Sequence, residues 1–348
     1  MPSPTVAARR DPPDGYEELL REAGTFYHEP AWIDGLGRLF RFPTYYVAVQ
    51  GETGLDGVLP LCAVPALLGR ARLVSLPFSY AAGPLARSAA ATERLYDGAR
   101  DLARRSGTTR VEIKRVAATG DAPPGFARVS RYATYKVPMR GGIDEVWHRL
   151  HQSSTQRGIR KSRRTGLVVE RPDGAAAWRE MAELQTLTSH RLGLPAPPDA
   201  FFVGLCRDLQ ERGLAQLYLA RLPTGGSAAG IVCWKGRREW IYAFGASRPE
   251  HLELRPNHAL LWAAMTDAAA AGVDFDLGRA APEQKGLVEF KVRWGGEAVP
   301  LTYDYWPDAG GLNVRPRDTG RLALLNKVWS ALPAPVARRG SFLYRYLG

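Results

Sequence analysis

The sequence predicts an α/β protein in which a mixed sheet is flanked by helices. Short apolar runs typical of strands alternate with longer segments whose apolar residues recur at helical spacing. The same succession of element types then occurs a second time with different residues. A chain of 348 residues is long enough for two domains that each bury a core. We therefore expect a duplicated fold.

The first round opens with three predicted strands, at residues 45–50, 57–64 and 72–78. Residues 92–107 follow with apolar positions at helical spacing, and Gly107 is a typical helix end. Two more strands are predicted over 110–115 and 132–139. The polar, Pro-rich start of the chain favours a flexible segment, which we place over residues 1–23. The first domain is predicted to span 24–138.

The second round is predicted to span residues 139–307. Its expected helices are 143–151, 154–164, about 174–191, 198–212 and 256–271, and its expected strands are 166–171, 214–221, 227–235, 239–246, 273–278 and 299–306. Residues 308–348 read as a Gly- and Pro-rich linker and an amphipathic helical tail. That tail is suited either to packing on the core or to a peripheral membrane contact.

Composition and charge restrict the functional classes. The net charge of +12 favours anionic partners such as RNA, nucleotide-linked substrates or anionic lipid. No apolar run is long enough to cross a bilayer, and the N-terminus lacks the apolar core of a secretory signal. We expect a cytoplasmic protein, with the inner face of the membrane as an alternative location. Cys62, Cys206 and Cys233 are predicted to be buried free thiols, and no metal-ligand spacing is present.

A basic segment begins the second round. No acidic residue occurs between Glu145 and Glu170, whereas arginines and a lysine are frequent there. Helical spacing places four of these cations on one face, namely Arg157, Arg160, Lys161 and Arg164. Such a face is either solvated or bound to phosphate groups, which the planar arginine fork can hold through two oxygens.

The stretch from Phe275 to Trp294 contains the strongest candidate for chemistry. A short apolar strand ends in Asp276, Gly278 and Arg279. We expect a Gly-containing loop to lead from there to Phe290-Lys291-x-x-Trp294, followed by another strand. Polar groups at the carboxyl end of a sheet strand commonly form the site of α/β proteins, although they also occur at solvated corners.

Five stretches together resemble the FemAB-like family of bacterial acyltransferases, which have tandem domains of the GNAT acetyltransferase type. The matching stretches are His28-x-x-x-Trp32; Leu59-Pro60-Leu61 with Ser75-Leu76-Pro77-Phe78 and Gly83-Pro84; Arg157 to Lys161; Tyr242-x-x-Gly245-Ala246-Ser247 with Pro256-Asn257; and residues 275–294. They occur in the family's order over residues 26–306. The resemblance therefore implies an α/β fold of two tandem GNAT-like domains, with the active cleft mainly in the second.

The resemblance also implies roles for individual residues. Lys291 would stabilise the oxyanion of a tetrahedral intermediate, whereas packing on Trp294 is the structural alternative. Arg279 would bind a carboxylate or phosphate of the acyl acceptor, or would form a clamp with Asp276. Asp276 is a candidate base, but we rank the structural role first. The remaining residues expected to line the cleft are Tyr80, Tyr242, Asn257 and Trp294, in addition to the basic segment.

Two departures from the family weaken the prediction of a cell-wall substrate. Gly83-Pro84 is followed by Leu85, Ala86 and Arg87, where the branch that builds peptidoglycan bridges has an acid. There is also no room for a helical hairpin between Arg191 and Gly213. An acetyl-CoA-type loop matches at Arg293-x-x-Gly296-x-Ala298, but a strand is predicted after it, so we interpret this match as chance.

The predicted activity is N-acyl transfer of an aminoacyl group from aminoacyl-tRNA to a primary amine of an envelope precursor or a small biosynthetic intermediate. The amine acceptor is expected to be phosphate-bearing. No tightly bound cofactor is expected, because the acyl donor is a co-substrate. One alternative is an acyltransferase that uses acyl-CoA. The other is a non-catalytic basic module that docks on RNA or on a membrane.

Overall fold

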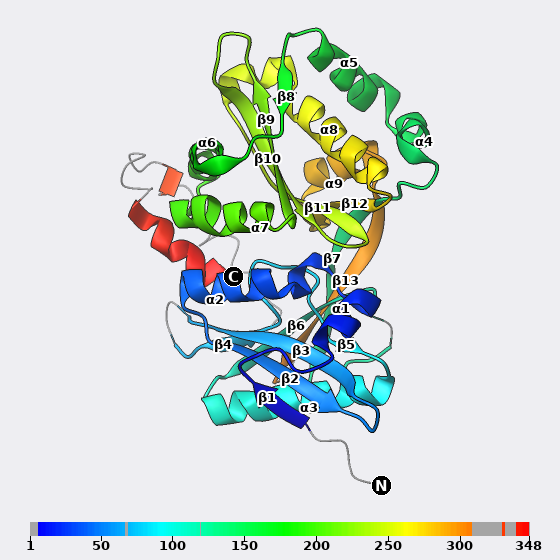
Figure 1. Ribbon diagram of the computed structural model, residues 1–348, viewed down its shortest axis with the longest axis vertical. Helices are drawn as coiled ribbons and strands as arrows, with labels where there is room; N and C mark the ends of the chain where they lie inside the picture. Colours follow the sequence, from blue (N-terminus) through cyan, green and yellow to red (C-terminus); the bar gives the residue numbers. More distant parts are fainter. Residues whose placement is uncertain (1–5, 67–68, 119, 308–328, 331–338, 348) are drawn as a thin grey trace. The chain divides into compact units, whose positions relative to one another are not determined.

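The computed structural model describes residues 6–66, 69–118, 120–307, 329–330 and 339–347 (Figure 1). These residues form two compact units. The first contains residues 6–132, 300–307 and 345–347, and the second contains residues 133–299, 329–330 and 339–344. Each unit is a mixed sheet with flanking helices, which confirms the predicted α/β class.

The first unit contains a mixed sheet with one parallel pair. In spatial order its strands are β1 (Val6–Arg9), β2 (Thr44–Gln50), β3 (Leu55–Val64), β4 (Arg72–Val74), β6 (Arg110–Val116) and β13 (Glu297–Trp306). All neighbours are antiparallel except β4 and β6. The short strand β5 (Leu85–Ala86) pairs with β3.

Helix α3 (Ala89–Ser106) provides the crossover between the parallel strands β4 and β6. The Ser88 hydroxyl caps its start by accepting a bond from the Ala91 amide, and Gly107 ends it in the left-handed region at φ 65°. Leu95 and Leu102 of α3 pack on Val111 in the core of this unit. The other helical elements of the unit are α1 (Tyr16–Ala23), η1 (Phe26–His28) and α2 (Pro30–Phe40).

The second unit repeats this sheet order. Its strands are β8 (Val168–Glu170), β9 (Ala215–Arg221), β10 (Ser227–Lys235), β11 (Glu239–Ser247), β12 (Asp274–Ala280) and the end of β7 (Ala127–Val137). Again only one pair, β11 and β12, is parallel. The matching order supports the predicted duplication, although the last strand of each unit comes from a distant part of the chain.

Helix α8 (Pro256–Ala270) is the crossover of the second unit, between β11 and β12. Its residues Leu260, Ala264 and Met265 are buried in one core cluster with Phe275 of β12. The other helical elements of this unit are α4 (Gly142–Arg149), the π-helical turn η2 (Gln152–Gln156), α5 (Arg157–Arg163), α6 (Gly174–Arg191), the π-helical turn η3 (Phe201–Cys206), α7 (Arg207–Glu211), η4 (Pro249–Leu254) and α9 (Lys285–Arg293).

Several expected boundaries differ from the structure. Within the segment expected to be flexible, residues 6–9 instead form β1, where Val6 and Ala8 align with Val49 and Val47 of β2. The loop expected before Phe290 is helix α9. This helix was not predicted because its pattern is inverted: Lys291 is 4% exposed, whereas Leu287 and Val292 are 39% and 54% exposed.

The strand expected over 72–78 ends at Val74 because Leu76 and Phe78 adopt positive φ values of 61° and 57°. The three cysteines are buried and free, as predicted. Most of the expected amphipathic tail lies outside the described residues. Its end forms η6 (Gly340–Leu347), in which Arg345 donates a hydrogen bond of 3.0 Å to the Phe40 carbonyl. No helix among the described residues is long and apolar enough to span a membrane.

Candidate functional site

The parallel strands of the second unit separate at their carboxyl ends. β11 and β12 pair only from Glu239 with Asp274 to Ile241 with Asp276, although the strands continue to Ser247 and Ala280. Beyond this ladder, the backbone N–H and C=O groups of β11 and β12 therefore form no hydrogen bonds with each other. The carboxyl edge of a parallel pair, next to the crossover helix, is where α/β folds commonly bind ligands.

A bulge in β12 shapes this edge. The register between β12 and β7 shifts between Asp276 and Arg279, and Gly278 lies in the left-handed region at φ 81°. Asp276 is fully buried, and its Oδ1 accepts hydrogen bonds from the Gly278 amide at 2.7 Å and from the Thr134 hydroxyl. Asp276 thus holds the backbone of the bulge in place.

Lys291 reaches the bulge from helix α9. Its ammonium group donates hydrogen bonds to the Leu277 carbonyl and, at 2.8 Å, to the Gly278 carbonyl. It also lies 5.9 Å from the centroid of the Tyr135 ring. Burial lowers the pKa of Lys291 from 10.5 to about 8, against the opposing effect of the Asp276 carboxylate. An ammonium has three donors, so one N–H remains for a substrate oxygen.

Tyr242 of β11 lies at the same bulge. A Cβ atom built on Gly278 would lie 3.4 Å from the Tyr242 carbonyl oxygen and 3.6 Å from Lys291 Nζ. A bulge in β11 also brings the Tyr242 ring over Gly245, where a Cβ atom would lie only 1.7 Å from the phenol oxygen. Three of the predicted site residues, Lys291, Asp276 and Tyr242, are therefore brought together around Gly278.

Trp294, three residues after Lys291, packs against the first turn of α8, which contains Asn257 and His258. The ring of His258, in the first turn of α8, lies 5.6 Å from the fully buried Trp294 ring. The Trp294 indole N–H and Asn257 Oδ1 are buried atoms with no hydrogen-bond partner among the described residues. Unpaired buried groups of this kind cost stability unless a ligand supplies the missing bonds. Burial also lowers the pKa of His258 to about 4, so this imidazole is neutral at physiological pH.

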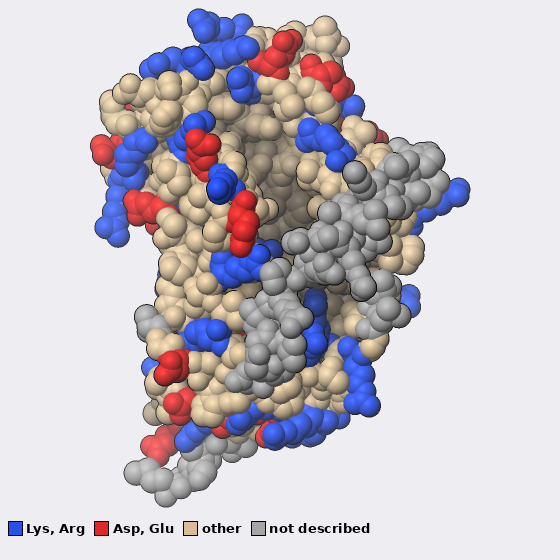
Figure 2. Space-filling view, turned by 180° about the vertical axis from the view of Figure 1, so that it is seen from behind, with Lys and Arg blue, Asp and Glu red and all other residues tan. Residues whose placement is uncertain are grey.

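The basic face of α5 is exposed, and the opposite face of the helix packs on the start of α8. Gly158, Ile159 and Ser162 are buried, whereas the four predicted cations and Arg163 are exposed. Figure 2 shows basic side chains gathered at the end of the second unit where Figure 1 places α5. The contact requires Gly158, because a Cβ atom there would lie 2.3 Å from Cδ2 of His258.

Arg160 is the most constrained cation on this face. Its guanidinium group donates a 3.2 Å hydrogen bond to Gln156 Oε1 and lies 5.3 Å from the ring centroid of Trp147. Trp147 in turn packs edge-to-face on Trp262 of α8 at 5.1 Å. The cation is thus held in a limited range of orientations, with an aromatic ring beside it.

Two predicted residues lie apart from this constellation. Arg279 follows the bulge but its side chain is exposed. Tyr80 belongs to the first unit, where its ring packs edge-to-face on Tyr27 at 5.3 Å. Nearby, His28 Nδ1 accepts a bond from the Thr25 amide and Nε2 donates to the Gly83 carbonyl at 2.9 Å, so this histidine organises the local turn.

Sequence reasoning missed Thr134, Tyr135 and Gly158. Thr134 and Tyr135 lie next to the bulge only because β7 pairs with β12, which is a contact between residues far apart in the chain. Gly158 lies within the quoted basic segment, but its role depends on the position of His258. The only available signal was a glycine within the basic segment, between Arg157 and Ile159.

Comparison with known proteins identifies a domain type and a fold. Residues 149–291 match the model of an acetyltransferase domain of the GNAT type. The crystal structure of FemX is similar with a TM-score of 0.63 and 17% identity, over 86% of this chain and 96% of FemX. Residues 149–291 thus match a GNAT-type acetyltransferase domain, and the chain as a whole has the tandem GNAT fold implied by the resemblance to the FemAB-like family. The predicted fold is confirmed.

Two further structures support the tandem GNAT fold of this chain. L-PGS from Bacillus licheniformis matches with a TM-score of 0.54 and 13% identity, over 93% of this chain and 98% of that protein. A tandem GNAT protein from the clavulanic acid biosynthesis pathway matches with a TM-score of 0.51 and 13% identity, over 86% of this chain and 98% of that one. Curated protein sequences show no match to the chain.

Proposed function

We propose that this acyltransferase moves an aminoacyl group from aminoacyl-tRNA to a primary amine of an envelope precursor or a small biosynthetic intermediate. The observation that carries the proposal is the exposed basic face of α5 beside the constellation around Lys291. A row of arginines at helical spacing fits the repeated charges of a nucleic acid backbone. The Trp147 ring next to Arg160 adds a surface on which an unpaired base can stack.

The basic face and the constellation are connected by direct packing within the second unit. Gly158 of α5 rests on His258, His258 contacts Trp294, and Trp294 lies three residues after Lys291. A long polyanionic donor held on α5 would therefore have a short path to the separated ends of β11 and β12. This arrangement therefore supports the predicted role of the basic segment in donor binding.

The proposed reaction needs positioning and oxyanion stabilisation rather than a covalent intermediate. The amine nitrogen attacks the ester carbonyl carbon, a C–N bond forms, and the ester C–O bond breaks. The leaving ribose hydroxyl takes up a proton, and the amine loses one to water or to a substrate group. The remaining N–H of Lys291 stabilises the oxyanion, Asp276 holds the bulge that orients Lys291, and exposed Arg279 contacts an anionic group of the acceptor. The donor is a co-substrate, and no resident cofactor takes part.

Acyl-CoA is the second candidate donor, favoured by the GNAT acetyltransferase match over 149–291. A pyrophosphate group is commonly held by free backbone amides of a Gly-rich loop at a helix start. Before α8, however, the chain forms η4, which contains no glycine, and the amides of His251 and Arg255 bond to carbonyls within the turn. The match at 293–298 is followed by β13 rather than by a helix, as predicted. These features favour tRNA over CoA.

The test is binding of the purified protein to a pool of charged tRNAs and to acyl-CoAs, with and without ribonuclease. Retention of an aminoacyl-tRNA that is lost on ribonuclease treatment supports the proposal. Replacement of Arg160 and Arg164 by alanine should weaken this retention. Replacement of Arg179 and Arg191, two exposed arginines of α6, changes the net charge equally and should have little effect. Turnover of a CoA thioester that is indifferent to ribonuclease would favour the second candidate.

A non-catalytic docking module makes a different prediction. In that case Lys291→Ala would leave all function intact, whereas the paired change of Arg160 and Arg164 would abolish binding. For an acyltransferase, Lys291→Ala should abolish turnover while tRNA retention persists. Steep salt dependence is expected for any RNA-binding protein and does not separate the two.

A further inference from the structure

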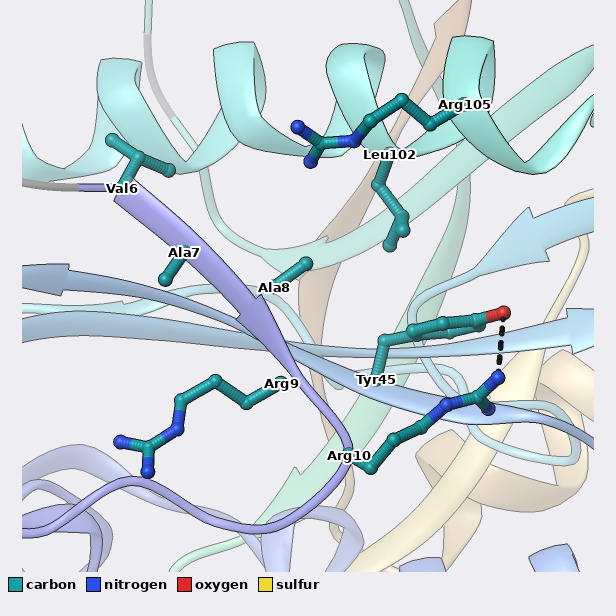
Figure 3. Close-up of a pocket in the computed structure, with 8 residues that line it drawn as sticks. All are labelled: Val6, Ala7, Ala8, Arg9, Arg10, Tyr45, Leu102 and Arg105. Atoms are coloured by element: carbon teal, nitrogen blue, oxygen red, sulfur yellow. Dashed lines mark hydrogen bonds between the residues drawn. The ribbon is translucent and has the colours of Figure 1, made fainter.

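A cavity lies in the first unit between the edge strand β1 and helix α3. Its volume is about 310 Å³, and its walls come from residues 6–10 together with Tyr45, Leu102 and Arg105 (Figure 3). The small side chain of Ala8 points toward α3 and leaves the space open between the strand and the helix. None of these residues belongs to the constellation around Lys291, which lies in the second unit.

All charged side chains that line this cavity are positive. Arg9, Arg10 and Arg105 line it, no acidic side chain does, and among the described residues none of the three arginines forms an ion pair. Figure 3 shows Arg105 lying along α3 on the side of the helix that faces the cavity and Arg10 beside Tyr45, whereas Arg9 is turned to the other side of the strand. Unpaired guanidinium groups gathered at a concave surface attract an oxyanion, and their planar forks hold two of its oxygens.

Arg10 and Tyr45 are held in place before any ligand binds. The Arg10 guanidinium donates hydrogen bonds of 3.3 Å to the Thr44 carbonyl and 3.2 Å to the Tyr45 hydroxyl, and its carbon lies 4.1 Å from the ring centroid. Because the phenol oxygen accepts this bond, its own proton is available for a ligand. The side chain of Arg105 has no such anchor among the described residues and is exposed.

Part of the cavity wall is apolar. Leu102 is 6% exposed, and Ala8 and Tyr45 pack on the same core cluster. Inorganic phosphate alone would leave this wall uncovered, whereas a molecule with a compact apolar part would bury it. The cavity therefore combines recognition of an oxyanion with room for an apolar group.

We infer that the first unit carries a binding site for a small organic oxyanion, with its phosphate or carboxylate group at Arg105 and Arg10 and its apolar part on Ala8, Tyr45 and Leu102. This site is separate from acyl transfer and does not depend on the identity of the acyl donor. The Arg105 fork moves onto the anion, while the Tyr45 hydroxyl donates to it.

Isothermal titration of the full chain with phenyl phosphate, benzoate and inorganic phosphate tests the site. Phenyl phosphate or benzoate should bind with measurable heat, and inorganic phosphate should bind more weakly than phenyl phosphate. Arg105→Gln should weaken binding of the organic anion about tenfold or more, because a charge-assisted bond is lost. Ala8→Leu should have a comparable effect because it fills the cavity. The relative affinities for phenyl phosphate and benzoate identify the preferred head group.

Arg104→Gln is the matched control. It removes one positive charge from the same turn of α3, but its guanidinium pairs with Asp101 and lies over Trp306, so it should bind the organic anions as the wild type does. Circular dichroism checks the fold of each variant. If Ala8→Leu fails to fold, Arg105→Gln still tests the site, because it changes only an exposed side chain. Absence of saturable binding by both organic anions at millimolar concentrations, or equal weakening by Arg104→Gln and Arg105→Gln, would overturn the inference.

Discussion

Replacement of Lys291 by methionine separates its catalytic role from its structural one. The side chain is 4% exposed, and its ammonium bonds to two carbonyls of the β12 bulge. Loss of an oxyanion donor typically costs about 3 kcal/mol of barrier, or about a hundredfold in kcat. We therefore expect Lys291→Met to lose about two orders of magnitude in acyl transfer, while donor binding stays close to that of the wild type.

The effect of Lys291→Met on stability should be much smaller at neutral pH. A pKa lowered from 10.5 to about 8 means that burying the charged form costs about 3 kcal/mol. Methionine removes this cost, but it leaves two buried carbonyls without a donor, at about 1–3 kcal/mol each. The two contributions largely cancel. A large loss of activity with a small change in the free energy of unfolding is the expected result.

The pH dependence of stability checks this reasoning independently. Between pH 8 and 10.5 the unfolded state still binds the Lys291 proton and the folded state does not. The free energy of unfolding of the wild type should therefore rise with pH across this window, by about 3 kcal/mol in total. Urea titrations of the wild type and Lys291→Met measure the difference, since the variant lacks this contribution. The advantage of Lys291 in turnover should disappear above pH 8, where the oxyanion donor is neutral.

Lys285→Met is the control, because it removes an exposed lysine from the first turn of the same helix. It should retain wild-type activity and the wild-type pH dependence. Equal pH dependence of stability in the wild type and Lys291→Met would refute the assigned burial cost. Retained turnover in Lys291→Met would refute the oxyanion role.

Three further variants test other parts of the molecule. Asp304→Ala should lower the free energy of unfolding by about 3–5 kcal/mol in chemical denaturation, because the buried carboxylate accepts hydrogen bonds of 2.7 and 2.8 Å from Arg128. Adding Arg128→Met should recover part of the loss. Gly158→Val should lower the free energy of unfolding by about 1–3 kcal/mol and reduce tRNA retention, because its Cβ would collide with His258. Gly204→Val, at a site with open space, is the control and should retain tRNA fully. As pH falls from 6.5 to 4, His28 should contribute a loss of about 3 kcal/mol of stability, because burial lowers its pKa to about 4. The His28→Gln protein should lack this contribution, and acid dependence equal to that of the wild type would contradict the assignment.

The sequence predicted the repeated fold because strand and helix periodicities are local signals. It also placed Lys291, Asp276 and Tyr242 in one site through the resemblance to a family. The physical reason for their proximity was not accessible, because it depends on a bulge at Gly278 and on the pairing of β7 with β12. Helix α9 was missed because its buried position is a lysine, so burial and apolarity do not coincide.

A different kind of failure concerns β1. Polar composition predicted a flexible start, but an edge strand needs only alternate positions that fit its neighbour, and Val6 and Ala8 are sufficient. The cavity beside it could not be predicted either, since it arises where small side chains of a strand meet the end of a helix that is about ninety residues further along.

The two units share a strand order but use their parallel strand pair differently. In the first unit, the segment after β4 bonds to β6: the Ser75 amide donates to the Glu112 carbonyl at 2.8 Å and the Ala82 amide donates to the Lys114 carbonyl at 3.2 Å. The buried Lys114 ammonium donates back to the Leu76 and Ser79 carbonyls of that segment. The backbone groups of β6 are thus used by the protein itself.

In the second unit the ladder between β11 and β12 ends at Ile241 and Asp276, and a lysine again bonds two carbonyls, but those of the bulge in β12 itself. Lys114 and Lys291 therefore both donate hydrogen bonds to carbonyls of irregular backbone, but the structural consequences differ. Lys114 secures a turn against β6, whereas Lys291 secures a bulge beside strands that have separated. A duplicated fold needs only one separated pair of parallel strands for chemistry. The pair β4 and β6 of the first unit is closed by the protein itself, whereas the pair β11 and β12 of the second unit stays separated, which explains why the candidate site lies in the second unit.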